Sequence, residues 1–515
     1  MSNKTDILIC SLPTLFVDRL PGAPALIKSA CKEAGFTAQT IDLSLDFYIN
    51  ESVRNLEQFN KLSSVFRPSE EPSESAIAAK DKWLKRAIGY IKDSNCPVVG
   101  LSVFTFFQHR AAYFLAKEIR KQLPNVKILV GGLGLNINCT SLSNLIKINR
   151  LDILNPFHVF LKINKLVDHV ILGVDGLDDI IKYLELELGV NAINGVIKEE
   201  IALKKNQYAS PVPDYDDYLI NEYMWPDGKS LPVTGSKGCV RACTFCDVPG
   251  QFGRFRMRTG VDIGNEIVQL ATRHGIRKFE FTDSLVNGSL KVFKEWMEVV
   301  ADYNNQQPIE NRITWFGQYI CRPQSQIPED LYSLMSQSGV VNLVIGVESG
   351  SNAILKDMKK KMTVEDVFDE LDMFEKYNIK AHFLMFSGFY TETRDRFIET
   401  IEFLIKCQRY VATGIVAKFS IGAPLYINND TYLHDHAEDL GLVIDPFNDF
   451  NWTTKEDPSN DLIQRTYNRL IQQELMDVLG YHASSQHVST MYQLDVMLSQ
   501  IENELEERLN EYAKT

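Results

Sequence analysis

Three of the nine cysteines lie close together in the segment 238–253, which reads GCVRACTFCDVPGQFG. Cys239, Cys243 and Cys246 have the spacing C-x3-C-x2-C, so three thiols fall within eight residues. A loop this short can direct three thiolates to one metal centre. A structural zinc site needs four ligands, and the next Cys or His is His274, near a predicted helix end. An iron–sulfur cluster held by thiolates, with one iron open to a substrate or cofactor, fits the spacing better.

The composition is that of a globular protein with a sizeable core. A length of 515 residues predicts about three domains. There are 54 basic and 67 acidic residues, giving a net charge of −13, which argues against broad binding of nucleic acid phosphates. The other six cysteines are scattered, as in proteins of reducing compartments. The longest apolar stretch, 98–107, is too short to span a membrane, and the first residues do not resemble a signal peptide. We therefore expect a cytoplasmic protein without membrane contact.

Residues 1–190 alternate between short apolar strands and stretches with helical periodicity. Short strands that are apolar on both faces, separated by helices, are typical of a parallel sheet covered by helices. We therefore predict an α/β domain with a doubly wound, Rossmann-like parallel sheet. The predicted strands are 6–13, 37–43, 98–105, 127–134 and 169–173, and the predicted helices are 23–34, 82–92, 110–123 and 177–188.

The predicted strands of this domain end in small and turn-forming residues. Ligands bind beyond the carboxyl ends of parallel strands, where glycine lets a ligand approach the backbone. The polar stretch 50–80 is expected to be a solvated loop, and residues 135–166 have no predicted structure. The candidate ligand-binding residues are Ser11, Pro13, Ser102, Thr105, Gly131, Gly132, Gly134 and Gly173.

A second alternating pattern extends over residues 230–425. Six βα units with right-handed crossovers would close into most of a barrel, and such barrels place their chemistry at the carboxyl ends of the strands. The cysteine loop follows the first strand, and Thr363 is expected to cap the fourth helix. The predicted strands are 232–236, 278–283, 312–319, 341–348, 381–387 and 416–421, and the helices are 261–274, 290–303, 329–338, 364–377 and 394–407.

The chain is therefore expected to have four regions. Residues 1–190 form the first sheet domain, 191–229 a connector, 230–425 the partial barrel and 426–515 a helical accessory region. The last region contains two amphipathic periods, 461–479 and 493–510.

The cysteine spacing, with Phe245 directly before the last cysteine, resembles the motif of the radical S-adenosylmethionine (SAM) superfamily. A partial barrel of six βα units is the core fold of that family. The resemblance implies a 4Fe-4S cluster on Cys239, Cys243 and Cys246, with SAM bound to the open iron. It also implies that an electron from the cluster cleaves SAM to methionine and a 5′-deoxyadenosyl radical, which abstracts hydrogen from an unactivated C–H group.

Two segments resemble SAM-binding motifs of the family. VIGVESGSN (344–352) is similar to its fourth-strand E-S-G motif, which implies that Glu348 and Ser349 contact the ribose and methionine parts of SAM. FEFTDSLVNG (279–288) follows the second strand and implies contacts from Thr282 and Asp283, with an ordinary strand-to-helix turn as an equal alternative.

Two further segments carry weaker similarity. FLMFSGFYTET (383–393) resembles a stretch in which Gly388 would let adenine lie against the backbone, although this chain lacks the usual Pro and Gly after it. GQYICRP (317–323) follows the third strand, and Gln318 and Arg322 could reach the carboxylate of SAM. For Arg322 the alternative is an ordinary surface position.

The first domain resembles the cobalamin-binding domain that precedes many radical SAM enzymes. The similarity is strongest in VVGLSVFTFF (98–107) and KILVGGLG (127–134). The chain has GVDGL at 173–177 where relatives have a turn like G-E-G-E, and it lacks the D-x-H-x-x-G motif whose histidine binds cobalt. The resemblance therefore implies cobalamin at the strand ends with no protein ligand to cobalt. The alternative is a retained fold that binds nothing, its cleft filled by Phe104, Phe106 and Phe107.

These features favour a radical SAM enzyme that methylates an unactivated carbon with the help of cobalamin. A radical rearrangement or cyclisation without methyl transfer is one alternative. A tRNA methylthiotransferase is another, but it would need a second cluster on three N-terminal cysteines, and Cys31 falls inside a predicted helix. A non-enzymatic protein with a structural metal loop is a third. We expect a small-molecule or peptide substrate and an electron donor such as flavodoxin or ferredoxin, with no nucleic acid partner.

Overall fold

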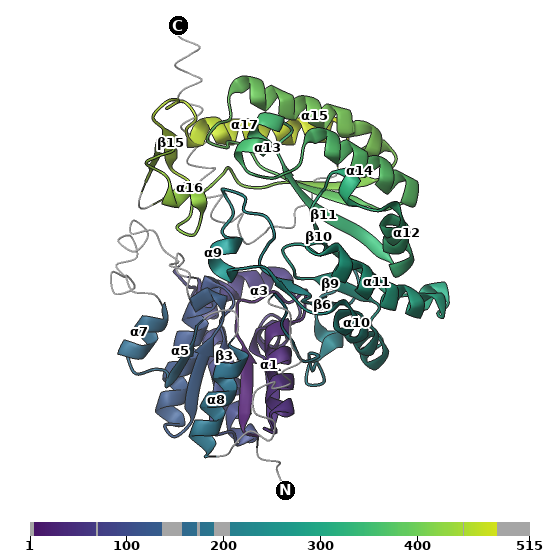
Figure 1. The fold of residues 1–515 in the computed structure, drawn as a ribbon. Coiled ribbons are helices and arrows are strands. Elements are labelled where there is room, and N and C mark those ends of the chain that lie inside the picture. Colours follow the sequence, from purple (N-terminus) through teal and green to yellow (C-terminus); the bar gives the residue numbers. More distant parts are fainter. Residues whose placement is uncertain are drawn as a thin grey trace. The chain divides into compact units, whose positions relative to one another are not determined.

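The computed structural model describes residues 5–67, 71–135, 157–172, 176–189, 206–445 and 448–481 (Figure 1). The chain divides into two compact units, Met1–Pro232 and Val233–Thr515. Within the described ranges, no helix combines the length and the hydropathy that a membrane span requires.

The first unit is built on a five-stranded sheet with the order β2-β1-β3-β4-β5, in which all neighbouring strands are parallel. Helices α1 (Gly22–Glu33) and α8 (Leu177–Leu188) share one hydrophobic core with the sheet, while α4 (Glu74–Ser94) and α5 (His109–Gln122) pack on each other (Figure 1). The predicted Rossmann-like α/β sheet is therefore confirmed. Its strands are β1 (Ile7–Ser11), β2 (Ala38–Asp42), β3 (Val98–Ser102), β4 (Lys127–Gly131) and β5 (His169–Ile171).

The prediction of a solvated loop at 50–80 is wrong. This stretch contains α3 (Leu56–Leu62), the 3-10 turn η1 (Ser63–Phe66) and the start of α4. Phe66 is fully buried and meets Trp83 of α4 edge to face, with ring centroids 5.3 Å apart. These helices are short and rich in polar residues, so their apolar side chains do not form a visible period. Their stability comes from packing against α4 instead.

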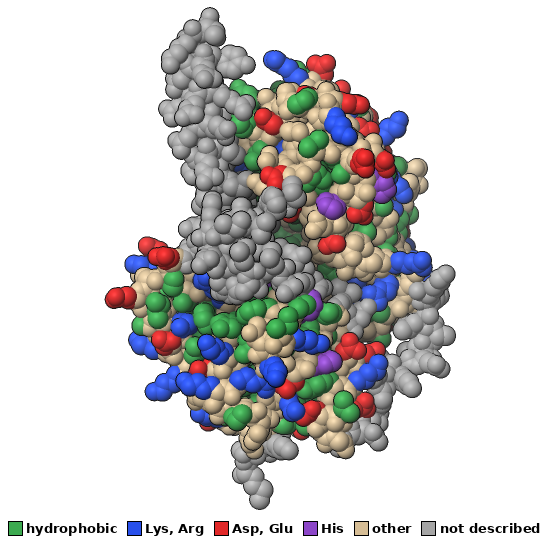
Figure 2. All heavy atoms as spheres, turned by 90° about the vertical axis from the view of Figure 1, so that its left-hand side faces the viewer, with side chains coloured by type: hydrophobic (Ala, Val, Ile, Leu, Met, Phe, Trp, Pro, Cys, Tyr) green, Lys and Arg blue, Asp and Glu red, His purple; other side chains and the backbone are tan. Residues whose placement is uncertain are grey.

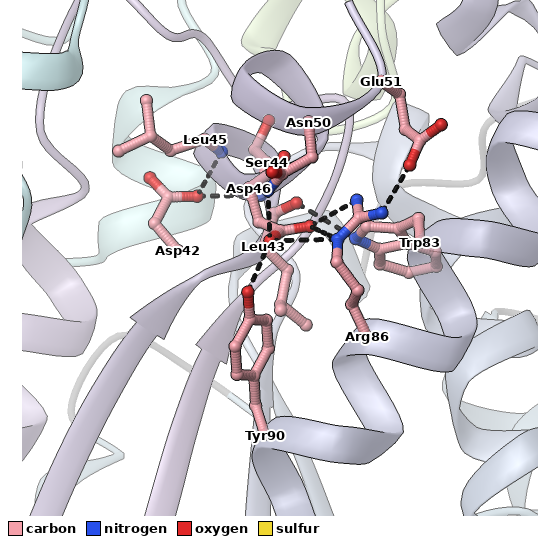
Figure 3. Close-up of polar contacts among 10 residues, drawn as sticks. All are labelled: Asp42, Leu43, Ser44, Leu45, Asp46, Asn50, Glu51, Trp83, Arg86 and Tyr90. Carbon is pink, nitrogen blue, oxygen red and sulfur yellow. Dashed lines mark hydrogen bonds and ion pairs between the residues drawn. The ribbon is translucent and has the colours of Figure 1, made fainter.

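Helix α2 (Leu43–Asn50) follows β2 without a loop and is fixed by a network of charges (Figure 3). Asp42 caps the helix by accepting hydrogen bonds from two backbone amides. Asp46 accepts from Arg86 and from Tyr90 of α4, each at 2.8 Å. Arg86 also pairs with Glu51. One guanidinium therefore neutralises two buried carboxylates and ties α2 to α4.

The segment after residue 206 returns to the edge of the first sheet. The ammonium group of Lys28, on α1, lies 3.1 Å from Asp214 and 2.7 Å from Asp217. Asp217 also accepts a hydrogen bond from the backbone amide of Thr40 in the edge strand β2. The region expected to be a connector thus covers part of an otherwise unpaired strand edge.

The second unit is built on a six-stranded sheet with the order β13-β12-β11-β10-β9-β6. Helices α10 (Gly260–His274), α11 (Leu290–Asn305), α12 (Glu329–Ser338), α14 (Val364–Tyr377) and α15 (Arg394–Ala412) alternate with the strands, as predicted. Thr363 and Asp366 form a capping box at the start of α14. The strands are β6 (Ser230–Val233), β9 (Lys278–Phe281), β10 (Thr314–Tyr319), β11 (Val340–Glu348), β12 (Ala381–Met385) and β13 (Val416–Ile421).

The region after β13 is more than helical. It contains the short helix α16 (Tyr432–Asp435), an antiparallel pair of strands, β14 (Leu442–Ile444) and β15 (Trp452–Thr454), and the long helix α17 (Leu462–Val478). Asp461 caps α17, close to the predicted boundary. The second predicted helix, 493–510, lies outside the described residues, as does most of 135–156.

Candidate cofactor site

The three clustered cysteines occupy a loop whose two ends are paired. Strand β7 (Ser236–Lys237) precedes the loop and forms an antiparallel pair with β8 (Arg256–Met257), which follows it. Cys239, Cys243 and Cys246 are free and partly exposed. The pairing brings the two ends of the loop together beyond β6, at the carboxyl end of the sheet.

Asp283 holds the base of this loop. Its carboxylate accepts hydrogen bonds from the backbone amide of Gly235, at 2.8 Å, and from the hydroxyl of Ser236. It is 3% exposed and lines a small pocket together with Ile263 of α10 and Trp296 of α11. Burial raises its pKa to about 7, although these hydrogen bonds favour the charged form. Asp283 therefore lies between the sheet and the outer helices, behind the cysteine loop.

Thr282 and Asp283 directly follow β9. Their side chains lie on opposite sides of the chain, because neighbouring residues in an extended segment alternate. The hydroxyl of Thr282 lies 2.7 Å from that of Thr234, and both residues are exposed. Gln318, near the end of β10, is likewise exposed, while the residues on either side of it are buried. Of the pair expected to contact SAM, Thr282 is exposed, whereas Asp283 is buried and bonded to the base of the loop.

Arg241 connects the cysteine loop to the next strands. Its backbone amide donates to Sγ of Cys239 at 3.3 Å, and its guanidinium donates to the carbonyl groups of Lys361, at 3.1 Å, and Cys321, at 3.4 Å. Arg322 donates to the carbonyl of Asn287 at 3.0 Å, so part of its side chain supports the loop after β9. Burial lowers the pKa of Arg322, and the nearby charge of Arg241 lowers it further.

The middle of the cysteine loop is held by two segments from elsewhere in the second unit. The backbone amide of Thr244 donates to Met358 at 3.1 Å, and its carbonyl accepts from the amide of Leu433 at 3.0 Å. Asn428 donates from its side chain to Asp247 at 3.1 Å. Residues 428–433 thus pack directly on the loop, a role that the sequence did not predict.

Phe245 packs into the hydrophobic cluster of the C-terminal segment, which includes Leu433 and Trp452. It also meets Phe386 edge to face, with centroids 5.1 Å apart. The aromatic residue before the last cysteine therefore anchors the loop by packing.

Glu348 and Lys360 form a largely buried ion pair beside the loop. Glu348 ends β11 after a bulge, with φ of 71°, and its carboxylate lies 3.4 Å from the ammonium of Lys360. The ammonium is 5.9 Å from the centroid of the Phe245 ring. Burial raises the pKa of Cys243, and the charge of Lys360 counteracts this effect. The sequence analysis missed Lys360, because KDMKKKMT has the composition of a solvated turn.

Ser349 and Gly388 are enclosed by the protein itself. The hydroxyl of Ser349 lies 3.1 Å from that of Thr400 and accepts from the amide of Ser351 at 3.2 Å. Gly388 has φ of 83°, and a Cβ there would lie 2.1 Å from Cδ of Arg465 on α17. Arg465 therefore covers the α-carbon of Gly388, on the side where a side chain would project.

At the carboxyl edge of the first sheet, glycines allow close contact between two loops. A Cβ atom at Gly132 would lie 2.2 Å from the carbonyl oxygen of Val103, and one at Gly134 would lie 2.8 Å from the backbone of Thr105. Gly132 has φ of 123°, a conformation that favours glycine. These glycines therefore allow the two loops to pack closely on each other, in addition to any role in ligand binding.

The same edge presents one buried hydroxyl and apolar rings. Ser11 is 1% exposed, and its hydroxyl has no hydrogen-bond partner among the described residues. Phe104 is 53% exposed, and Phe106 and Phe107 lie beside each other with centroids 4.0 Å apart. Phe104 therefore does not fill a closed cleft.

Of the other predicted residues at this edge, Pro13 is buried, while Ser102 and Gly131 are partly exposed. Gly173 and the GVDGL turn lie largely outside the described residues.

The chemistry of the donor set fits an iron–sulfur cluster. Across the described ranges, no group of three or more His, Cys, Asp and Glu side chains could hold a single metal ion. In a 4Fe-4S cube each thiolate binds a different iron, so the ligands are spread around the cube. Three free cysteines on a loop with fixed ends are compatible with this arrangement.

Comparison with known proteins gives the class of the second unit. The sequence model of the family described as "Radical SAM superfamily" matches residues 233–404. Residues 233–404, about a third of the chain, therefore form a radical SAM domain, and such a domain implies a 4Fe-4S cluster and SAM as cofactors.

Relatives of the chain include methyl- and methylthiotransferases. The ribosomal protein uS12 methylthiotransferase RimO of Clostridium botulinum is 30% identical over 241 residues, which are 45% of this chain and 53% of that protein. The uncharacterized methyltransferase PH0819 of Pyrococcus horikoshii is 24% identical over 341 residues, 64% of this chain and 68% of the relative. The chain spans about half the length of the methylthiotransferases that it matches.

Solved structures share the fold of both units. The radical SAM methyltransferase TsrM of Kitasatospora setae, with cobalamin and a 4Fe-4S cluster bound, has a TM-score of 0.57 at 14% identity, covering 85% of this chain and 77% of that one. The cobalamin-dependent radical SAM enzyme OxsB, with aqua-cobalamin bound, has a TM-score of 0.59 at 16% identity, covering 97% and 71%. At these identities the likeness shows the fold, a Rossmann-like sheet followed by a radical SAM sheet.

Proposed function

We propose that the chain is a cobalamin-dependent radical SAM enzyme that methylates an unactivated carbon of a small-molecule or peptide substrate. The observation that carries the proposal is the presence, in one chain, of a radical SAM domain and a five-stranded parallel sheet with glycine-containing loops at its carboxyl edge. When bound, the cluster and SAM supply the electron and the carbon radical, and cobalamin supplies the methyl group.

The residues of the second unit bind and orient these cofactors. Cys239, Cys243 and Cys246 hold the cluster, and Asp283 keeps the base of their loop in place through Gly235 and Ser236. Glu348 and Lys360 present opposite charges next to the loop, which suits the amino and carboxylate groups of SAM. Residues 428–433 cover the loop and limit the access of water.

The contact with SAM is shared among the loops after several strands. Thr282, Gln318 and Arg322 follow or end the second and third strands of the barrel, and Ser349 and Gly388 follow the fourth and fifth. Ser349 and Gly388 contribute through the conformation of the backbone at these loops, because the side chains of Thr400 and Arg465 occupy the space around them.

In the first unit, Ser11, Ser102, Thr105 and the glycines 131, 132 and 134 line the proposed cobalamin site. The orphaned hydroxyl of Ser11 and the exposed ring of Phe104 fit a large ligand with polar and apolar faces. His109 is not free to bind cobalt, because its ring stacks on Phe157 and its Nε2 lies 2.7 Å from the carbonyl of Gly134. Burial lowers the pKa of His109 to about 4, so it stays neutral.

The test is anaerobic reconstitution with iron, sulfide and hydroxocobalamin, followed by desalting. We expect about four iron atoms per chain, a corrinoid spectrum in the protein fraction and 5′-deoxyadenosine after reduction with SAM present. A protein fraction with an intact cluster but no corrinoid would exclude cobalamin-dependent methylation. Transfer of a labelled methyl group from SAM to product would separate methylation from rearrangement or cyclisation.

A methylthiotransferase is the second candidate, favoured by the relatives that match over almost half of the chain. Such an enzyme needs a second cluster in the first unit. Cys10, Cys31 and Cys96 are all buried there, and burial raises the pKa of each thiol. About eight iron atoms per chain after reconstitution would support this candidate, and about four would exclude it.

The face drawn in Figure 2 has Lys and Arg side chains interspersed with Asp and Glu. This mixture of charges suits a small-molecule or peptide substrate better than a nucleic acid.

A further inference from the structure

Thr244 lies between two of the clustered cysteines, next to Cys243 and two residues before Cys246. It is 3% exposed, although the cysteines around it are partly exposed. Its hydroxyl is fully buried and has no hydrogen-bond partner among the described residues. Buried hydroxyl groups in folded proteins nearly always have a partner, so this one calls for an explanation.

The position of Thr244 is fixed on both sides by its backbone. Its amide donates to Met358, and its carbonyl accepts from Leu433. These bonds come from two segments far apart in the sequence, so residue 244 cannot rotate without breaking one of them. The backbone of residue 244 is therefore held in place between Cys243 and Cys246, and the buried side chain is attached to a fixed point of the loop.

We propose that the hydroxyl of Thr244 donates a hydrogen bond to a sulfur atom of the iron–sulfur cluster, either a bridging sulfide or a cysteine thiolate. The orphaned donor, its burial and its place between two ligands are the observations that carry the proposal. The inference rests on the proposed role of the three cysteines and adds a positioning residue that also tunes the cluster.

The hydrogen bond has a defined effect on reduction. Hydrogen bonds to the sulfurs are among the factors that set the potential of a cluster. An added electron makes the cluster more negative, and a donor stabilises the more negative state more strongly. The hydroxyl of Thr244 therefore raises the reduction potential, which makes the cluster easier to reduce.

The decisive variant is Thr244→Val, which keeps the shape of the side chain and removes the hydroxyl. We expect normal iron and sulfide content. At a fixed applied potential, the ratio of reduced to oxidised cluster should fall by up to about tenfold relative to the wild type. For a one-electron couple this corresponds to a midpoint lower by up to about 59 mV. The measurement is a redox titration of the loaded protein followed by electron paramagnetic resonance, without substrate.

Two variants serve as matched controls. Thr244→Ser keeps the hydroxyl and should keep the wild-type midpoint. Thr466→Val removes a buried hydroxyl of α17 that already donates to Leu462 at 2.7 Å, and it should not move the midpoint.

An unchanged midpoint in a fully loaded Thr244→Val variant would overturn the proposal, since a water molecule would then be the partner of the hydroxyl. Loss of the cluster in Thr244→Val but not in Thr244→Ser would support the hydroxyl contact. Loss in both would overturn it in favour of a packing role. Failure of the wild type itself to bind a cluster would contradict the proposed function instead.

Discussion

The loops at the carboxyl ends of the two sheets are held in different ways. In the first unit, the loops after β3 and β4 meet through backbone atoms, and Gly132 and Gly134 make that contact possible. The ion pairs of Arg86 with Asp46 and Glu51 lie in and beside α2 and α4, not in these two loops. In the second unit, the cysteine loop is held by the buried carboxylate of Asp283 and lies beside the pair Glu348–Lys360.

The difference shows what each edge is suited to do. Loops fixed by backbone contact can offer an extended, largely neutral surface to a large ligand. Loops fixed by buried charges can hold a metal centre and charged groups of a cofactor in place, because the electrostatic effects are strong where water is excluded. The same sheet architecture therefore supports two kinds of site.

The largest expected effect is at the cysteine loop. Cys243→Ala should abolish cluster binding and the formation of 5′-deoxyadenosine, because two thiolates cannot hold the cube on their own. Iron and sulfide analysis after reconstitution measures this directly. Cys31→Ala, in the buried core of α1, is the control and should retain the cluster. A full cluster in the Cys243 variant would show that the loop is not the ligand set.

The next effect concerns the charges at the flank of the first unit. Arg86→Met would leave Asp46 and Glu51 buried without a counter-charge, and we expect the free energy of unfolding to fall by about 3 kcal/mol. Denaturant unfolding monitored by circular dichroism measures the change. Arg54→Met removes a partner of the exposed pair with Glu222 and should cost less than about 1 kcal/mol.

A smaller effect tests the backbone contact of the first edge. Gly132→Ala would place a Cβ against Val103 and would put a side chain at a position where φ is positive. We expect this change to destabilise the first unit by about 2 kcal/mol and to weaken corrinoid binding. Gly189→Ala is the control, because its φ is also positive, at 64°, but no atom of the described residues lies within 4 Å of the added Cβ. Equal losses for both variants would mean that the close contact at Gly132 has no importance of its own.

Taken per pH unit, the smallest effect is a dependence of stability on pH at the second edge. The folded-state pKa of Asp283, about 7, lies above its ordinary value of 3.8, so the folded state retains a proton that the unfolded state releases. Its contribution to stability is present below pH 3.8 and is lost as the pH rises to about 7. Between these values the free energy of unfolding should fall by up to about 1.4 kcal/mol per pH unit from this group. Asp283→Asn should remove that slope in thermal unfolding curves.

Much of the fold could be predicted because the strands are apolar and the helices have clear periods. The six strands of the second unit fall close to their predicted ranges, and Thr363 caps α14 as expected. Helix α3 and the 3-10 turn η1 were missed, because their burial depends on ring contacts with other helices, Phe59 with Phe47 and Phe66 with Trp83, and not on a local pattern. The strand pair β14–β15 was missed for a similar reason, since each strand has three residues.

The candidate site was predictable where side chains form a motif and not where contacts are long-range. The cysteine spacing identified the loop, and the motifs pointed to Glu348. Nothing in the sequence could show that Leu433 bonds to Thr244, or that Arg465 lies over Gly388, because these pairs are far apart along the chain. Lys360 was hidden by its charged neighbours, and its burial is a property of the fold.

The pairing of β7 with β8 has a consequence for how the cluster is assembled. Bringing the ends of a loop together costs conformational entropy, and the chain meets this cost when the second unit folds. The pairing is made by backbone atoms and uses no cysteine side chain, so it does not itself require the cluster. Insertion of iron and sulfide therefore needs no folding step, and the apoprotein should be a stable acceptor for cluster delivery, unlike small zinc domains that fold only with their metal.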